Sequence, residues 1–293
     1  MGSPLTGLLC ATIADRLDRD TALGQHVLDW PGDPDGWADG LPLRLCGGLH
    51  ALFRSGTAPR LAACYPPNQL PDQAGLARVL REAFDDHAAF LLPWLDRTPQ
   101  TNEVGRSSAL MAGLLVAADR FPLPMQLLEL GASAGLNLLL DRFRHDLGGT
   151  QAGDPNSPLL LRPDWQGPAP PAAQVCIAAR RGVDLHPVDP VADRERLLAY
   201  VWPDQPQRLR QIEAALAIAA AEPPQVDARD AADWLDVHLP SPEAGVTCVV
   251  MHSVAWQYFP EATQARAAAD CGGRRGGAGG CPARLAALRK GAG

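Results

Sequence analysis

The residues with the clearest chemical potential lie in one glycine-containing segment, Met125-Gln-Leu-Leu-Glu-Leu-Gly-Ala-Ser-Ala-Gly-Leu-Asn137. It opens with an apolar run of strand character and continues into an amphipathic stretch. Gly131 and Gly135 permit a tight turn and a close approach of backbone to ligand, and a helix starting there would point its first amides at that ligand. Glu129, at the strand end, can receive an amine or an amide donor. The pattern predicts a strand–turn–helix that binds a nucleotide-like ligand.

The spacing of the glycines in this segment indicates which class of ligand the turn can bind. A dinucleotide fingerprint fails, because Ser133 and Leu136 stand where glycines are needed, and a phosphate-binding P-loop fails because its lysine is absent. The order acidic-x-Gly-x-small-x-Gly resembles the motif that S-adenosylmethionine methyltransferases place after their first strand. Glu129, Gly131, Ser133 and Gly135 match it, with Ser133 replacing the usual middle glycine. S-adenosylmethionine is therefore the expected cofactor.

Two other interpretations of the same turn stay open. It can be a glycine turn that only packs a helix on a strand. It also reads as G-x-S-x-G, the nucleophile elbow of α/β-hydrolases, with Ser133 as nucleophile and Asp184 or Asp189 followed by His252. Against the elbow, the first 120 residues read as helical and leave no place for the strands that precede a hydrolase nucleophile. His252 also follows an apolar strand directly, whereas the hydrolase histidine belongs on a late loop.

Two aspartates are candidates for the rest of the cofactor. Asp184, preferred over Asp189, follows the second strand and is expected to accept the ribose hydroxyls, since a carboxylate accepts two such donors. Asp230 is expected to border the adenine, or to cap the helix that follows it. An ordinary turn or helix-capping role is the alternative for both.

A second group of candidates concerns the substrate. His252 leaves the last clear strand at its carboxyl end, where open α/β sheets place active sites, and is the candidate general base. The remaining candidates wall a substrate pocket or fold over the ligand as a lid: Asn102, Glu103, Arg106, Trp256 and Tyr258. Each candidate also has an ordinary structural alternative. The histidine can be a hydrogen-bonded structural residue, the two aromatic residues can belong to the core, and the polar cluster of residues 102, 103 and 106 can be a helix cap with a solvated face.

The elements that position these residues change character near residue 120. Helical periodicity dominates before it, over Leu5–Asp18, Leu41–Arg54, Asp72–Leu95 and Ser107–Asp119. Strands then alternate with helices: strands at Gln126–Leu130, Gln174–Ala179, Gln225–Ala228 and Val246–Met251, helices at Arg194–Trp202 and Gln207–Ala221, and an inserted extended segment at Pro155–Arg162. This predicts an α/β fold: a helical N-terminal part, 1–120, and a Rossmann-like, methyltransferase-like parallel sheet, 121–266.

The end of the chain has a different composition. A helix is expected over Glu261–Arg266, but residues 267–293 are rich in glycine and lack apolar periodicity. We expect this segment to be a low-complexity, disordered tail, produced by a frameshift or truncation that removes the last strands of the sheet. A natural flexible tail is the alternative.

Composition limits the possible partners. The 293 residues are 46% hydrophobic and 20% charged, with a net charge of −7, which is a poor footprint for nucleic-acid binding. No apolar run reaches the ~18 residues of a membrane span, and the N-terminus lacks a signal peptide. The seven cysteines are scattered without metal-ligand spacing. A cytoplasmic protein acting on a small molecule, without a metal, nucleic acid or membrane partner, is expected.

Several motifs together resemble a bacterial family known as domain of unknown function 2332. They are Tyr65-Pro-Pro, Thr101-Asn-Glu-Val-Gly-Arg106, Glu129-Leu-Gly-Ala-Ser-Ala-Gly-Leu-Asn-Leu138, Tyr200-Val-Trp-Pro-Asp-Gln-Pro206, Ala231-Ala-Asp-Trp-Leu235 and His252-Ser-Val-Ala-Trp-Gln-Tyr258. The resemblance implies a methyltransferase-like Rossmann domain with an N-terminal helical portion, and it implies no substrate. A methyltransferase acting on a small molecule is expected; a catalytically inactive ligand-binding or structural protein is the alternative. The sequence leaves the oligomeric state open.

Overall fold

The computed structural model describes residues 2–36, 38–239 and 245–273. The chain forms two compact units. The helical unit consists of Met1–Thr101 and Arg194–Arg210, and the sheet unit of Asn102–Asp193 and Gln211–Gly293. This division differs from the boundary expected at residue 120. The helix over 107–120 packs within the sheet unit, and residues 194–210 return to the helical unit.

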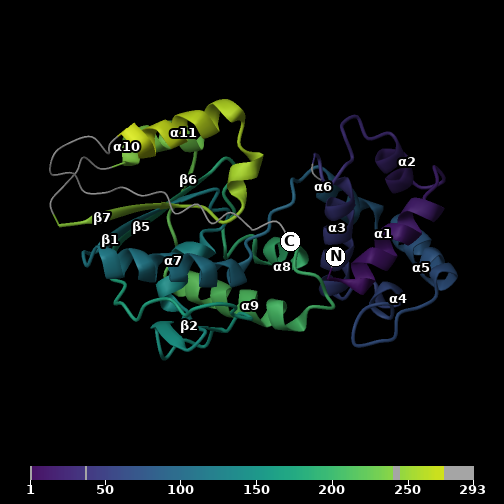
Figure 1. Ribbon diagram of the computed structural model, residues 1–293. Coiled ribbons are helices and arrows are strands. Elements are labelled where there is room, and N and C mark those ends of the chain that lie inside the picture. The colour runs from purple at the N-terminus through teal and green to yellow at the C-terminus, as the bar shows by residue number, and fades with distance from the viewer. Residues whose placement is uncertain (1, 37, 240–244, 274–293) are drawn as a thin grey trace. The chain divides into compact units, whose positions relative to one another are not determined.

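The helical unit is built from short helices (Figure 1), and their buried side chains form a leucine-rich core. Its helices are α1 (Pro4–Arg16), α2 (Ala22–Leu28), α3 (Leu41–Ser55), α4 (Pro59–Ala62), α5 (Gln73–Asp86), α6 (Ala88–Leu95) and α8 (Arg194–Ala199). The single helix expected over Asp72–Leu95 is two helices, because His87 leaves the helical conformation with φ −123° and ψ 22°. Asp72 caps α5 by accepting a hydrogen bond from the amide of Gly75 at 2.7 Å.

The return of residues 194–210 to the helical unit has identifiable causes. Nδ1 of the buried His50 lies 3.0 Å from the carbonyl oxygen of Ala199. Arg54 pairs with Glu195 at 2.8 Å. A side chain at Gly47 would come within 2.6 Å of the ring of Tyr200, so α3 and the segment after α8 pack closely only because residue 47 is glycine. These long-range contacts attach α8 to α3.

The sheet unit contains a parallel sheet of four strands in the order β6-β5-β1-β7. The strands are β1 (Met125–Leu130), β5 (Ile177–Asp184), β6 (Val226–Ala228) and β7 (Thr247–Met251). Glu129 of β1 lies opposite Gly182 of β5 and Met251 of β7. The protein is thus a mixed α/β structure, as expected from the alternation of strands and helices.

Helices cover both faces of this sheet. Leu128 and Leu130 of β1 pack with Trp234 and Leu235 of α10 (Ala231–His238) and with Ala267 of α11 (Glu261–Gly273). Figure 1 shows α10 and α11 on one face of the sheet and α7 (Ser107–Arg120) on the other. Helix α9 (Pro206–Ala221) completes the α-helices of the described residues, and short 3-10 helices precede α7 (η1, Val104–Arg106) and α11 (η3, Ala255–Tyr258).

The segment after the glycine turn differs from the expected helix. It forms a short 3-10 helix, η2 (Leu136–Arg142), which is kinked at Leu139. The chain then enters a small second sheet, in which β2 (Arg144–Leu147) lies between β3 (Thr150–Gly153) and β4 (Leu160–Leu161). The expected extended segment at Pro155–Arg162 supplies β4.

The last described helix continues past its expected end at Arg266. Ala267 is fully buried in the core of the sheet unit, so α11 continues to Gly273. Residues 267–273, which were expected to belong to the frameshifted or truncated tail, are therefore helical, and the rest of the expected tail, residues 274–293, lies outside the described residues. No helix in the described part of the chain is long and apolar enough to cross a membrane.

Candidate functional site

The glycine turn lies at the carboxyl edge of β1 and has an unusual backbone. Gly131, Ser133 and Gly135 all adopt positive φ, at 68°, 54° and 72°. Serine adopts this conformation less readily than glycine. A Cβ on Gly131 would also lie 2.1 Å from Cβ of Ala255, and one on Gly135 would lie 2.8 Å from Pro224. Both glycines are therefore required by the packing of the turn against the protein itself.

Two of the predicted residues hold the turn through its amides. The amide of Ser133 donates to Oδ2 of Asp184 at 2.9 Å, and the amide of Leu136 donates to Oδ1 of the buried Asn102 at 2.9 Å. Asp184 is the last residue of β5, and its other oxygen accepts from the amide of His186 at 2.9 Å. Side-chain oxygens thus occupy two amides that a phosphate group would otherwise use.

Glu129 is the most unusual group at this edge. Its side chain is 1% exposed, and Oε2 has no hydrogen-bond partner among the described residues. Burial raises the pKa of Glu129 to about 8; Asn137 lowers it, Asp184 raises it and Arg106 lowers it, each to a smaller extent. The carboxyl group is therefore mostly protonated at neutral pH, and a cation placed beside it would favour the ionised form.

Arg106 supplies a positive charge near this carboxyl group. It ends η1, and its Nη1 donates to Oγ of Ser253 at 3.5 Å. Burial lowers the pKa of its guanidinium group, while Tyr258 and Glu129 raise it. Residues from three elements, η1, β1 and η3, therefore share one electrostatic neighbourhood.

His252 follows β7, the strand that pairs with β1. Its side chain is 6% exposed, and neither ring nitrogen has a hydrogen-bond partner within the described residues. Burial lowers the pKa of the imidazole. The ring stacks on Trp256 with 5.3 Å between centroids, and Trp256 packs against the core beneath it. A neutral imidazole with two unused nitrogens can accept a proton from a bound substrate.

Two other predicted residues act as helix caps. Oε1 of Glu103 accepts from the amide of Gly105 at 3.0 Å. Oδ1 of Asp230 accepts from the amides of Ala232 and Asp233, as the capping alternative anticipated, and Oδ2 accepts from Thr263 of α11 at 3.1 Å. Neither cap depends on a ligand.

Sequence reasoning missed three neighbours of the site. Asn137 is buried beside Glu129, Ser253 contacts Arg106, and Ala255 packs on Gly131. Asn137 could have been found from the sequence, because it is a polar residue inside an otherwise leucine-rich run. Ser253 and Ala255 carry no such signal, because their roles depend on which strand lies next to β1.

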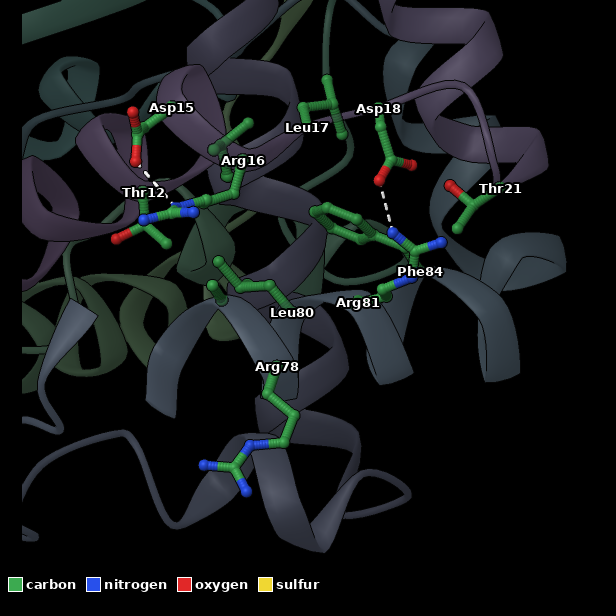
Figure 2. Close-up of a pocket in the computed structure, with 12 residues that line it drawn as sticks. Thr12, Asp15, Arg16, Leu17, Asp18, Thr21, Arg78, Leu80, Arg81 and Phe84 are labelled. Carbon is green, nitrogen blue, oxygen red and sulfur yellow. Dashed lines mark hydrogen bonds and ion pairs between the residues drawn. The ribbon is translucent and has the colours of Figure 1, made fainter. Parts of the chain in front are cut away.

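A separate hollow of about 570 Å³ lies in the helical unit between α1 and α5 (Figure 2). Leu17, Leu80 and Phe84 form its apolar part. Arg81 at its rim pairs with Asp18 and Asp20. This hollow contains none of the predicted site residues. No group of His, Cys, Asp and Glu that could hold a metal is found among the described residues.

Comparison with known proteins identifies the family. The chain belongs to the family described as "Uncharacterized protein conserved in bacteria", domain of unknown function 2332, whose pattern matches residues 1–272. This confirms the resemblance found in the sequence. No curated protein and no solved structure matches the chain.

Proposed function

We propose that the sheet unit is Rossmann-like and binds S-adenosylmethionine at the carboxyl edge of β1. Numbered along the chain, the strands of the main sheet follow the order 3-2-1-4, which matches the first four positions of the doubly wound order 3-2-1-4-5-6. Ligands of such sheets bind where the strand order reverses. In this sheet that position lies between β1 and β7, the strands that lead to Glu129 and His252.

The observation that carries the proposal is the buried carboxyl group of Glu129, whose Oε2 has no hydrogen-bond partner among the described residues. A buried carboxyl oxygen without a hydrogen bond is costly, and a ligand ammonium group would satisfy it. The amino-acid end of S-adenosylmethionine has an ammonium group for Glu129 and a carboxylate for Arg106. The chain therefore offers a group of opposite charge to each end of that zwitterion.

The occupied amides of the turn favour this cofactor over a nucleotide with phosphates. The side chains of Asp184 and Asn102 already accept hydrogen bonds from the amides of Ser133 and Leu136. A phosphate would have to displace these side chains, and it would lie beside the acidic residues Glu129 and Asp184. S-adenosylmethionine has no phosphate. The carboxylate of Asp184 retains acceptor capacity for ribose hydroxyls, since it has about four lone-pair sites.

The reaction that fits these groups is methyl transfer to a small molecule. The cofactor supplies an activated methyl group when it is bound. The protein would position the acceptor in line with that group, which provides most of the rate enhancement. His252 would take the proton of a protonated nucleophile, and Trp256 and Tyr258 would form the wall on the acceptor side.

One observation favours the hydrolase alternative. Ser133 combines a G-x-S-x-G context with φ of 54°, as a nucleophile elbow requires. However, its hydroxyl cannot be hydrogen-bonded to His252, because both ring nitrogens of His252 lack partners in the described part of the chain. β1 is also the first described strand in the chain, so no described strand precedes the serine.

Thermal-shift measurements with several ligands, together with an esterase probe, test the methyltransferase proposal and the hydrolase alternative. S-adenosylmethionine and S-adenosylhomocysteine should raise the midpoint of the wild-type protein in a concentration-dependent way, because both bind only the native state. NAD and ATP should not raise it. A fluorophosphonate esterase probe should not label Ser133. Stabilisation by NAD or ATP alone, or labelling that Ser133→Ala removes, would replace the proposal; binding without any turnover would support a ligand-binding protein.

A further inference from the structure

Two cysteines of the helical unit lie next to each other although they are distant in the sequence. Cys10 belongs to α1 and Cys46 to α3, and their Sγ atoms are 3.6 Å apart. Both are free thiols in the structure. A disulfide bond is about 2.05 Å long, so the two sulfur atoms would have to approach by about 1.5 Å to form one.

We propose that Cys10 and Cys46 form a redox-active dithiol that hydrogen peroxide converts into an intramolecular disulfide. The two thiols differ in access. Cys10 is half-buried and can meet a small oxidant at the surface, whereas Cys46 is only 3% exposed. This asymmetry assigns the attacking role to Cys10 and the resolving role to Cys46.

The protonation of the pair supports these roles. The hydrogen bond from Cys46 lowers the pKa of Cys10 to about 7. The same contact, together with burial, raises the pKa of Cys46 well above its ordinary value. The thiolate is the nucleophile in such reactions. When the pair loses a proton near neutral pH, the negative charge therefore lies on the accessible sulfur and the remaining proton on the buried one.

The chemistry balances in two steps. The Cys10 thiolate attacks one oxygen of hydrogen peroxide and breaks the O–O bond, giving a sulfenic acid and a hydroxide ion that takes up a proton to become water. The sulfur of Cys46 then attacks the sulfenic sulfur, loses its proton and expels the second oxygen as water. In total, two thiols lose two electrons and two protons to one peroxide.

The other described cysteines provide controls. Burial raises the pKa of Cys64, whose Sγ lies 3.7 Å from the carbonyl oxygen of Arg60. Cys248 is buried in the core of the sheet unit. Cys176 is exposed and lies in the other unit from the pair. Cys176→Ser is therefore the matched control for simple accessibility.

The proposal is tested on the full-length reduced protein by brief treatment with hydrogen peroxide and peptide mapping without reductant. The expected product has lost the mass of two hydrogen atoms and two of its seven free thiols, with Cys10 and Cys46 in one linked peptide that dithiothreitol separates. Cys176→Ser should form the same link. Cys46→Ser should stop at a sulfenic acid on Cys10 that dimedone traps, and Cys10→Ser should lose the link.

Different outcomes would overturn the proposal. Oxidation of Cys10 to a sulfinic or sulfonic acid without a link would show that Cys46 does not resolve the intermediate. A link that joins either residue to another cysteine, or preferential oxidation of Cys176, would show that exposure alone decides. Mapping of the wild-type protein needs no variant, so the result stands even if Cys46→Ser fails to fold.

Discussion

The burial of Glu129 should influence stability as well as binding. Its pKa in the folded protein is about 8, above the ordinary value of 4.5. Between these two values the folded state holds a proton that the unfolded state has released, so this group reduces stability as pH rises from about 4.5 to 8. The proposed ligand-binding role would explain why a group that costs stability lies at this position.

Glu129→Gln should therefore stabilise the protein at pH 8 much more than at pH 5. Glutamine keeps the shape of the protonated carboxyl group without the ionisation, and the gain at pH 8 should be on the order of a few kcal/mol. Urea unfolding at both pH values measures the difference. Glu261→Gln, at an exposed position in the first turn of α11, is the control, and any small loss of helix-dipole stabilisation should be the same at both pH values. An equal effect of Glu129→Gln at both pH values would contradict the assigned pKa.

At the scale of elements, most helices could be predicted from their hydrophobic periodicity. Strand β5, which lies later in the chain than expected, shows why the bounds of other elements could not. The expected helix over Leu41–Arg54 matches α3 within one residue. The strand expected over Gln174–Ala179 is β5, at Ile177–Asp184. Arg180 and Arg181 look unfavourable in a strand until their partners Asp141 and Asp227 are known. A local sequence pattern cannot predict ion pairs between residues that are distant in the sequence.

The same limit applies to the candidate site. The sequence pattern placed Glu129 and Asp184 near the turn, because strand ends in a parallel sheet meet at one edge, and it placed Asn102 in a lid that folds over the ligand. It could not reveal that Asp184 and Asn102 accept from the amides of the turn. Nor could it identify the short η2, because an apolar run such as Leu138–Leu140 fits an α-helix equally well.

The packing of the turn on η3 can be tested by a double-mutant cycle. Gly131→Ala should destabilise the protein by about 2–4 kcal/mol, from the collision with Ala255 and from positive φ. Ala255→Gly should recover the part due to the collision and leave about 1–2 kcal/mol of backbone strain. Denaturant unfolding of both single variants and the double variant measures the coupling. Additive effects would show that the two residues do not meet.

At the scale of the whole molecule, the two compact units allow the dithiol and the turn to be examined separately. The Cys10–Cys46 link would close a long loop within the helical unit, and such links stabilise by about 2–4 kcal/mol. Hydrogen exchange should show the protection rising in α1 and α3 after oxidation, with β1 and β7 unchanged. Equal changes in both units would mean that they unfold together.

The most direct test of the proposed site is calorimetric titration of S-adenosylhomocysteine into the wild-type protein, Glu129→Gln and Glu261→Gln. Loss of the charged partner should weaken binding by roughly tenfold to a hundredfold in Glu129→Gln, while Glu261→Gln should bind like the wild type. Because the ligand ammonium favours the ionised carboxylate, wild-type affinity should rise between pH 6 and pH 8, with proton release below pH 8, and Glu129→Gln should lose this dependence. Binding by Glu129→Gln that equals the wild type at both pH values would remove Glu129, and the site built around it, from the account.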